Sequence, residues 1–234
     1  MTQCLTMARG RRMRLTRVDE CGAPVPGPAG QLVTSGFVSV ANAPNYADPE
    51  EITQTNANGD PCIDDQGNPT FRWIDLTIIF CQIDPDAFNI ITGNPLVVND
   101  AAEPESVGFR INADDTGTAH FALEIWSGGT GASACEGGAA QYGYWLYPHV
   151  LQARVGEWTV ENAALTMTLT ARTGIGGGWD VGPYDVRADG TTGDPEPLLT
   201  PITGSDHMHF EITTVAPPEP ACGAVELPEP APEG

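Results

Sequence analysis

The sequence predicts a mainly β protein, a β-barrel or β-sandwich with one short flanking helix and long loops. Polar and apolar residues alternate with period two in several segments, as in half-buried strands. Gly and Pro are abundant, at 27 and 21 of 234 residues, and only one segment carries helix boundary signals. No stretch approaches the roughly 18 apolar residues that predict a membrane-spanning helix, so we expect no membrane association.

The clearest strand is expected at 164–171, where Leu165, Met167, Leu169 and Ala171 share one face and three threonines share the other. Segment 72–81 is more apolar and is expected to lie centrally in a sheet. One side of this strand is predicted to carry Ile74, Leu76, Ile78 and Phe80, and the other side Trp73, Thr77 and Ile79. Shorter strands are expected at 14–18, 35–41, 106–112, 119–126, 142–151 and 157–160.

One short helix is expected from Asp84 to Thr92. Asp84 is a candidate N-cap and Pro85 suits the first helical position, where a proline loses no hydrogen bond. Gly93 follows as a C-terminal stop signal. Phe88 and Ile91 are three residues apart and are therefore expected to pack against the sheet from the same side of the helix.

Charge excludes several kinds of chemistry. The formal net charge is −21, from 31 acidic residues against ten arginines, and the chain has no lysine. A P-loop lysine, a Schiff-base lysine and a Ser-Lys dyad are therefore excluded. Such an acidic surface repels the phosphate backbone of nucleic acids.

Three regions are expected. Residues 1–13 form a basic N-terminal arm, residues 14–215 the β domain, and residues 216–234 a Pro- and Glu-rich tail that is extended or disordered unless a neighbour holds it. The arm lacks the apolar stretch of a secretory signal, so we expect no export by that route. Long polar loops are expected at 42–69, 127–138 and 173–205, and loops of this length commonly serve binding or contact between subunits.

Two glycine-rich segments imitate catalytic motifs without completing them. Residues 174–179, GIGGGW, begin like a dinucleotide-binding turn, but the sixth position is Trp179 and no βαβ unit surrounds them. Residues 131–135, GASAC, resemble a nucleophile elbow without its final glycine. Both are interpreted as loops, and no catalytic or cofactor-binding residue is predicted.

Two groups of residues are candidate metal ligands. His207 and His209 would share one face of a strand and could hold a metal together with Glu211, while Met208, Phe210 and Ile212 would face the core. No supporting zinc motif is present, so solvent-facing or interface histidines are the preferred interpretation. Asp64, Asp65, Asp114 and Asp115 suggest calcium loops, but none has the required ligand spacing, so turns are preferred. No metal or other cofactor is therefore predicted.

Six cysteines are spaced too widely for a zinc ribbon or a C-x-x-C redox pair: Cys4, Cys21, Cys62, Cys81, Cys135 and Cys222. We expect buried or free thiols. The alternative is a set of disulfides that form after release from the cell.

An ordered series of segments resembles the major tail proteins of siphophages that infect actinobacteria. The segments are VDECG at 18–22, TSGFVSV at 34–40, FCQIDP at 80–85, ITGNP at 91–95, VGFR at 107–110, FALEIW at 121–126, GPY at 182–184, DHMH at 206–209, TTVAPP at 213–218 and ACG at 221–223. The series covers most of the chain, and its order is more specific than any single segment.

This resemblance implies a structural virion protein and no enzyme. Six copies would form a ring, and the rings would stack into a non-contractile tail tube for DNA ejection, in the virion tail after assembly in the host cytoplasm. Implied partners are other copies of the chain, the tape measure protein, and the tail terminator and distal tail proteins; DNA would pass an acidic lumen without specific binding. The alternative function is a monomeric Ig-like surface or adhesion module that binds calcium or a glycan, and a third is a metalloenzyme built on His207 and His209.

Overall fold

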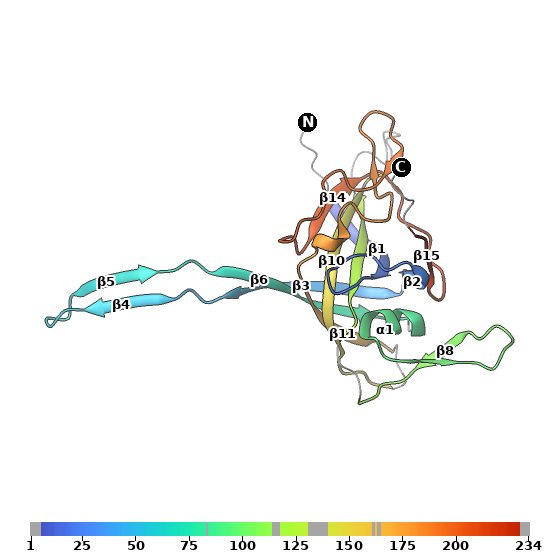
Figure 1. The fold of residues 1–234 in the computed structure, drawn as a ribbon, viewed down its shortest axis with the longest axis horizontal. Helices are drawn as coiled ribbons and strands as arrows, with labels where there is room; N and C mark the ends of the chain where they lie inside the picture. The colour runs from blue at the N-terminus through green and yellow to red at the C-terminus, as the bar shows by residue number, and fades with distance from the viewer. Residues whose placement is uncertain are drawn as a thin grey trace.

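Antiparallel strands dominate the structure, a computed structural model that describes residues 6–82, 84–113, 118–130, 140–160, 162 and 165–229. They form a compact body from which one long β-hairpin projects far to one side (Figure 1). The mainly β prediction is therefore confirmed. No helix in these ranges combines the length and apolar character needed to cross a membrane.

One large sheet runs through the body. Its strands, in spatial order, are β15 (Val225–Leu227), β2 (Gly27–Thr34), β1 (Thr6–Arg17), β9 (Phe121–Thr130), β10 (Tyr142–Val155), β11 (Met167–Thr173), β6 (Thr70–Phe80) and β3 (Phe37–Ala47). A further strand, β14 (His209–Thr213), pairs with the first half of β10, and β11 pairs with the second half. Every pairing between these strands is antiparallel.

The sheet curls without closing into a barrel. Phe37, on the edge strand β3, lies so close to Gly10 of β1 that a Cβ at Gly10 would meet the phenyl ring at 2.8 Å. The two strands are not paired within the described part of the chain, where β3 and β15 form the ends of the sheet. Open strand edges are sites where another chain can add by backbone hydrogen bonding.

The helix α1 (Pro85–Thr92) covers one face of the curled sheet. Asp84 caps it by accepting a hydrogen bond from the backbone N–H of Asp86 at 2.9 Å, and Gly93 ends it with φ at +77°. Phe88 and Ile91 are 3% and 0% exposed, as predicted for core-facing positions. They pack in a core with inward-facing side chains of six strands, among them Met13, Leu15, Leu76, Ile78, Leu123 and Leu169.

Residues 174–206 cover the opposite face of the sheet. This segment includes a short 3-10 turn, η2 (Gly177–Trp179), and the small hairpin of β12 (Arg187–Ala188) and β13 (Pro195–Glu196). Trp179, Val186, Leu198 and Ile202 are buried with Ala122, Trp126, Tyr144 and Leu146 of the sheet in a second core. The loop expected at 173–205 is therefore a cover that packs on the chain's own sheet through a few buried side chains.

The predicted strands are reproduced with shifted ends, apart from segment 157–160. That segment has no strand structure, and Trp158 and Val160 are 47% and 82% exposed. The chain leaves the sheet after Val155, where the N–H of Gly156 makes its last ladder-like bond to Thr168. In 72–81 the alternation is confirmed, because Ile74, Leu76, Ile78 and Phe80 are all buried. In 164–171 Met167, Leu169 and Ala171 are buried, but Leu165 precedes the strand and is 36% exposed.

Both terminal regions contribute strands to the sheet, which was not predicted. Residues 6–13 belong to the segment expected as a basic N-terminal arm, but they form the first part of β1 and pair with β9. The buried side chains of Met13 and Leu15 alternate along β1 on one face of the sheet. In the C-terminal tail, β15 pairs with β2. The N–H groups of Gly223 and Ala224 donate to the carboxylates of Asp84 and Asp86 at the helix N-terminus. The tail is extended, and the chain's own body holds it.

Two further hairpins lie outside the main sheet. β4 (Glu51–Thr55) pairs with β5 (Pro61–Gln66), and β7 (Leu96–Val98) pairs with β8 (Ser106–Phe109). In the second hairpin, β8 forms the first part of the strand expected at 106–112. This hairpin contacts α1 through the stacked rings of Phe88 and Phe109, whose centroids are 3.7 Å apart. Both hairpins point away from the body (Figure 1).

Candidate functional site

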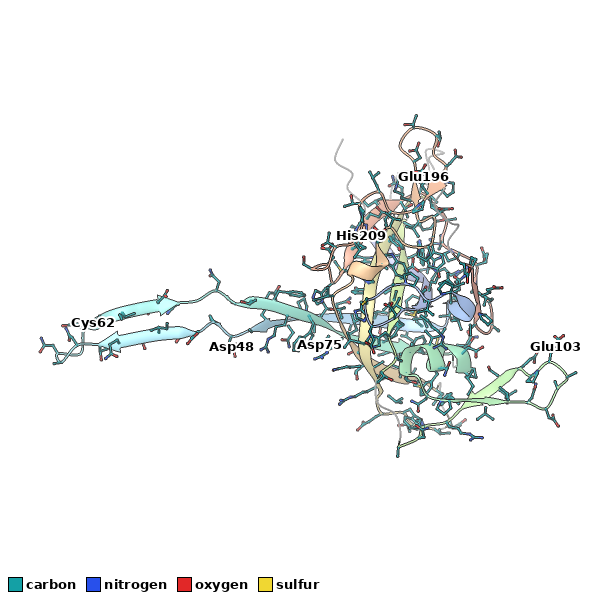
Figure 2. The ribbon with its side chains drawn as sticks, viewed as in Figure 1. Asp48, Cys62, Asp75, Glu103, Glu196 and His209 are labelled. Atoms are coloured by element: carbon teal, nitrogen blue, oxygen red, sulfur yellow. The ribbon has the colours of Figure 1, made fainter. Side chains whose placement is uncertain are left out.

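The largest feature outside the core is the projecting hairpin, residues 45–73, which we call the arm. It begins as the outer ends of β3 and β6, with Asn45 opposite Trp73 and Tyr46 opposite Phe71, and it continues through β4 and β5. Cys62 lies near the far end and Asp75 lies where the arm meets the body (Figure 2). The region predicted as a loop at 42–69 is therefore a two-stranded ribbon.

A closed turn ends the arm. The side chain of Asn56 accepts hydrogen bonds from the N–H groups of Asn58 and Asp60, each at 2.9 Å. Gly59 has φ at +88°, a conformation that glycine adopts without the steric cost of a Cβ. This Asn-based turn fixes the register of the two strands, so the ribbon has defined faces.

The arm has no hydrophobic core of its own. Every residue from Glu50 to Arg72 is exposed, although a two-stranded hairpin alone is at best marginally stable in water. Ile52 and Ile63 lie diagonally across the two strands on one face and remain 51% and 49% exposed. A long ribbon that exposes isoleucines is typical of a surface that becomes buried on contact with another chain.

All charged side chains of the arm up to residue 71 are negative. Residues 45–71 contain no arginine or lysine and six acidic residues: Asp48, Glu50, Glu51, Asp60, Asp64 and Asp65. Asp64 and Asp65 follow each other in β5 and so point to opposite faces. This geometry does not bring their carboxylates together on one ion; they lie in a strand and not in the turn that was predicted. Asp114 and Asp115, also considered as calcium ligands, lie outside the described residues.

A groove lies at the root of the arm, on the outer face of the sheet. Neighbouring positions of β6, β11 and β10 line it, and its charged and aromatic members are Trp73, Asp75, Arg154 and Arg172. Arg172 lies opposite Asp75 in the strand register, and its guanidinium carbon is 5.0 Å from the centre of the Trp73 ring. Trp73 donates its indole N–H to Asp75 at 2.9 Å. We call this surface the arginine groove.

A polar network is buried under the 174–206 cover. Arg14 makes two 2.5 Å hydrogen bonds to the carboxylate of Glu124, which also accepts one from the hydroxyl of Tyr144 at 2.7 Å. Burial alone would lower the pKa of Arg14, but the charge of Glu124 reverses this and the pKa is raised. Burial and the same carboxylate raise the pKa of Tyr144 well above its ordinary value. The network is buried away from solvent, so it fits a structural role, holding residues 174–206 on the sheet, better than a catalytic role.

The histidines predicted as candidate metal ligands have separate partners. Nδ1 of His207 lies 2.8 Å from the hydroxyl of Thr173, whereas Nε2 of His209 lies 3.5 Å from Glu211. Met208 and Phe210 are 38% and 37% exposed, so the prediction that they face the core is wrong. The reason is that β14 lies at an edge and packs Phe210 on Trp145. Across the described ranges, no three His, Cys, Asp or Glu side chains are placed to hold a metal together.

A second histidine pair, which the sequence did not indicate, lies beside this region. Nδ1 of His120 and Nε2 of His149 are 2.7 Å apart, and the other ring nitrogen of His149 bonds to the carbonyl of Ile175. Burial lowers the pKa of His149, although the Ile175 carbonyl opposes the shift. The pair fixes the start of the cover segment on β10.

The glycines at 174–179 serve packing. A Cβ on Gly176 would lie 2.2 Å from Pro148, and one on Gly178 would lie 2.5 Å from the carbonyl of Cys21. Their lack of side chains lets the backbone approach the sheet and bury Trp179. The other glycine-rich motif, 131–135, lies outside the described residues.

The described cysteines are unpaired and exposed: Cys21, Cys62, Cys81 and Cys222. Cys4 and Cys135 lie outside the described residues. The described thiols are therefore free, as one part of the prediction had it, and not buried; disulfides that form after release from the cell stay a prediction.

Comparisons with known proteins add no family assignment. A scan against protein-family models found no match, and a search of curated proteins found no matching sequence. The fold and the site define the class: a mainly β protein whose sheet has open edges in the described part of the chain, with an exposed, acidic arm.

The sequence did not predict the arm, but it contained a usable signal. Tyr46 and Phe71 frame the segment symmetrically, and their rings meet edge to face with centroids 5.7 Å apart. Between them, Asn56 and Gly59 form a turn flanked by short polar runs with an isoleucine in each. High polarity and three prolines obscured the alternation, because prolines normally argue against a strand.

Proposed function

We propose that this chain is a self-assembling structural subunit of a tailed-phage tail tube. Six copies form a ring, rings stack into a non-contractile tube, and the tube conducts DNA during ejection. Its partners are further copies of the chain, the tape measure protein, and the tail terminator and distal tail proteins. Its location is the virion tail, after assembly in the host cytoplasm, and it has no enzymatic role.

The exposed arm is the single observation that carries this proposal. Folding the arm costs backbone entropy of about 1–2 kcal/mol for each ordered residue. Its exposed residues recover little of that cost through burial within their own chain. Contact with a second subunit would bury Ile52 and Ile63 and supply the missing stabilisation.

Two other features support self-assembly. The curled sheet has free edges at β3 and β15 in the described part of the chain, and neighbouring copies can continue such a sheet around a ring. The excess of 31 acidic over ten basic residues suits a conduit that DNA must cross without sticking.

Electron microscopy and light scattering of the purified full chain test the proposal. We expect rings of six copies and, at higher concentration, stacked tubes. A protein that remains monomeric at millimolar concentration would contradict it and would favour the adhesion-module alternative.

A further inference from the structure

Charge is segregated between the arm and its root. The ribbon at 45–71 carries six carboxylates and no cation, whereas three of the five arginines beyond residue 20 gather at the root: Arg72, Arg154 and Arg172. Within the described part of the chain, no carboxylate lies within 4.0 Å of the guanidinium nitrogens of these three arginines. On a chain with net charge −21, these three arginines without ion-pair partners form a local excess of positive charge.

Aromatic contact holds two of these arginines in place. The guanidinium carbons of Arg72 and Arg172 lie 5.5 and 5.0 Å from the centre of the same Trp73 ring. A cation near an aromatic face is positioned but not neutralised, so its N–H donors remain available for a carboxylate. Arg154 is exposed on β10, opposite Thr170, and lines the same groove.

The ribbon of the arm complements this groove in chemistry. Antiparallel pairing places Ile52 and Ile63 together on one face with Asp65 beside them, and Glu51 and Asp64 on the other. The groove offers the complementary set, an indole surface between guanidinium groups. Ile52 and Ile63 against Trp73 would bring Asp65, on the same face of the ribbon, towards Arg154 and Arg172, and so would satisfy both surfaces at once.

The arm cannot reach the groove of its own subunit. The groove lies at the root, and the paired strands carry β4 and β5 away from the body to the far end, where Cys62 is located (Figure 2). The occupant must therefore come from a second copy of the chain.

We propose that the acidic arm of one copy docks in the arginine groove of the next copy, in a head-to-tail contact. Such a contact joins two different surfaces, so it repeats around a closed ring or along a filament. The inference rests on the self-assembly proposed above and names the two surfaces that make one of its contacts. The contact weakens as salt rises, because its charges are near the surface.

Charge reversal in two separate variants tests the contact. The groove variant carries Arg154→Glu and Arg172→Glu, and the arm variant carries Glu51→Arg, Asp64→Arg and Asp65→Arg. Each alone places like charges opposite each other, and we expect its assembly to require about tenfold higher concentration or more. A one-to-one mixture restores opposite charges at every contact, so we expect it to assemble with the two variants alternating.

A matched control reverses three exposed acids on the other projecting hairpin, Asp100→Arg, Glu103→Arg and Glu105→Arg. The control changes the net charge by the same amount as the arm variant but leaves the arm and the groove unchanged, so we expect it to assemble normally. Circular dichroism and thermal unfolding establish that each variant is folded, and light scattering and electron microscopy measure assembly.

The outcomes separate the two proposals. Three results would overturn the docking contact and leave the proposed tube function standing. They are single variants that assemble like the parent, a folded mixture that stays dissociated, and an equal assembly defect in the matched control. A parent protein that forms no assembly would overturn both.

Discussion

Arg14 and Glu124 face each other across β1 and β9 as a bidentate ion pair, with both hydrogen bonds at 2.5 Å and the two residues 6% and 0% exposed. The guanidinium of Arg14 also lies over the ring of Tyr184 at 3.3 Å from its centre. The pair thereby joins the sheet to the cover segment, at a position where neither charge can regain water without unfolding.

We expect Glu124→Gln to lower the free energy of unfolding by about 3–5 kcal/mol, because it leaves a buried guanidinium without its counter-charge. The double variant Arg14→Met, Glu124→Met removes both charges, and we expect it to be less destabilised than Glu124→Gln. Urea unfolding of unassembled protein measures both. A Glu124→Gln protein as stable as the parent would show that the pair does not hold the cover.

Removal of the arm should spare the fold and abolish assembly. Ala47 and Thr70 are paired across the ribbon, so an Asn-Gly turn can replace residues 48–69. The excised residues are almost all exposed, and we expect the free energy of unfolding to change by no more than about 1 kcal/mol. Normal tubes from this variant in the microscope would exclude the arm as an assembly element.

Stability should fall when the pH drops below about 6.5, the ordinary histidine value. Burial lowers the pKa of His149, so the folded state binds fewer protons than the unfolded state between the two pKa values. The stabilisation is therefore complete above the ordinary pKa and is lost as pH falls towards the folded pKa. Thermal unfolding between pH 7.5 and 5.0 measures the slope, and His149→Gln should reduce it. An unchanged slope in that variant would assign the effect to other groups.

The paired substitution His207→Gln, His209→Gln should leave assembly intact. The two rings have different partners, Thr173 and Glu211, and lack a third ligand among the described residues. Metal analysis of the purified parent should find no stoichiometric zinc. Bound zinc, or unfolding in the presence of a chelator, would reverse this interpretation.

Assembled tubes should not retain duplex DNA at physiological salt. A bore lined with carboxylates repels phosphate over roughly a Debye length, about 8–10 Å, and so keeps the DNA near the axis. Filter binding at 0.15 M salt tests retention, and a reconstruction of the tube shows which side chains face the bore. A neutral or positive bore with the carboxylates on the outer wall would leave acidity with a role in solubility alone.

The sequence by itself determined the local elements whose signals are short in range. The α1 boundaries followed from Asp84, Pro85 and Gly93, because capping acts within one helical turn. The core face of β6 followed from the alternation of Ile74 to Phe80, because side chains of a strand point to opposite faces in turn.

Only the tertiary structure decided where the polar segments lie. Residues 174–206 became a cover packed on the sheet, because the sheet offers Trp126 and Tyr144 on a face that must be buried, while the equally polar 45–73 became an exposed arm. The pairing of Arg14 with Glu124 and the gathering of Arg154 and Arg172 around Trp73 join residues from separate strands. Strand order and register set such contacts, and both depend on burial summed over the whole sheet, which no single segment encodes.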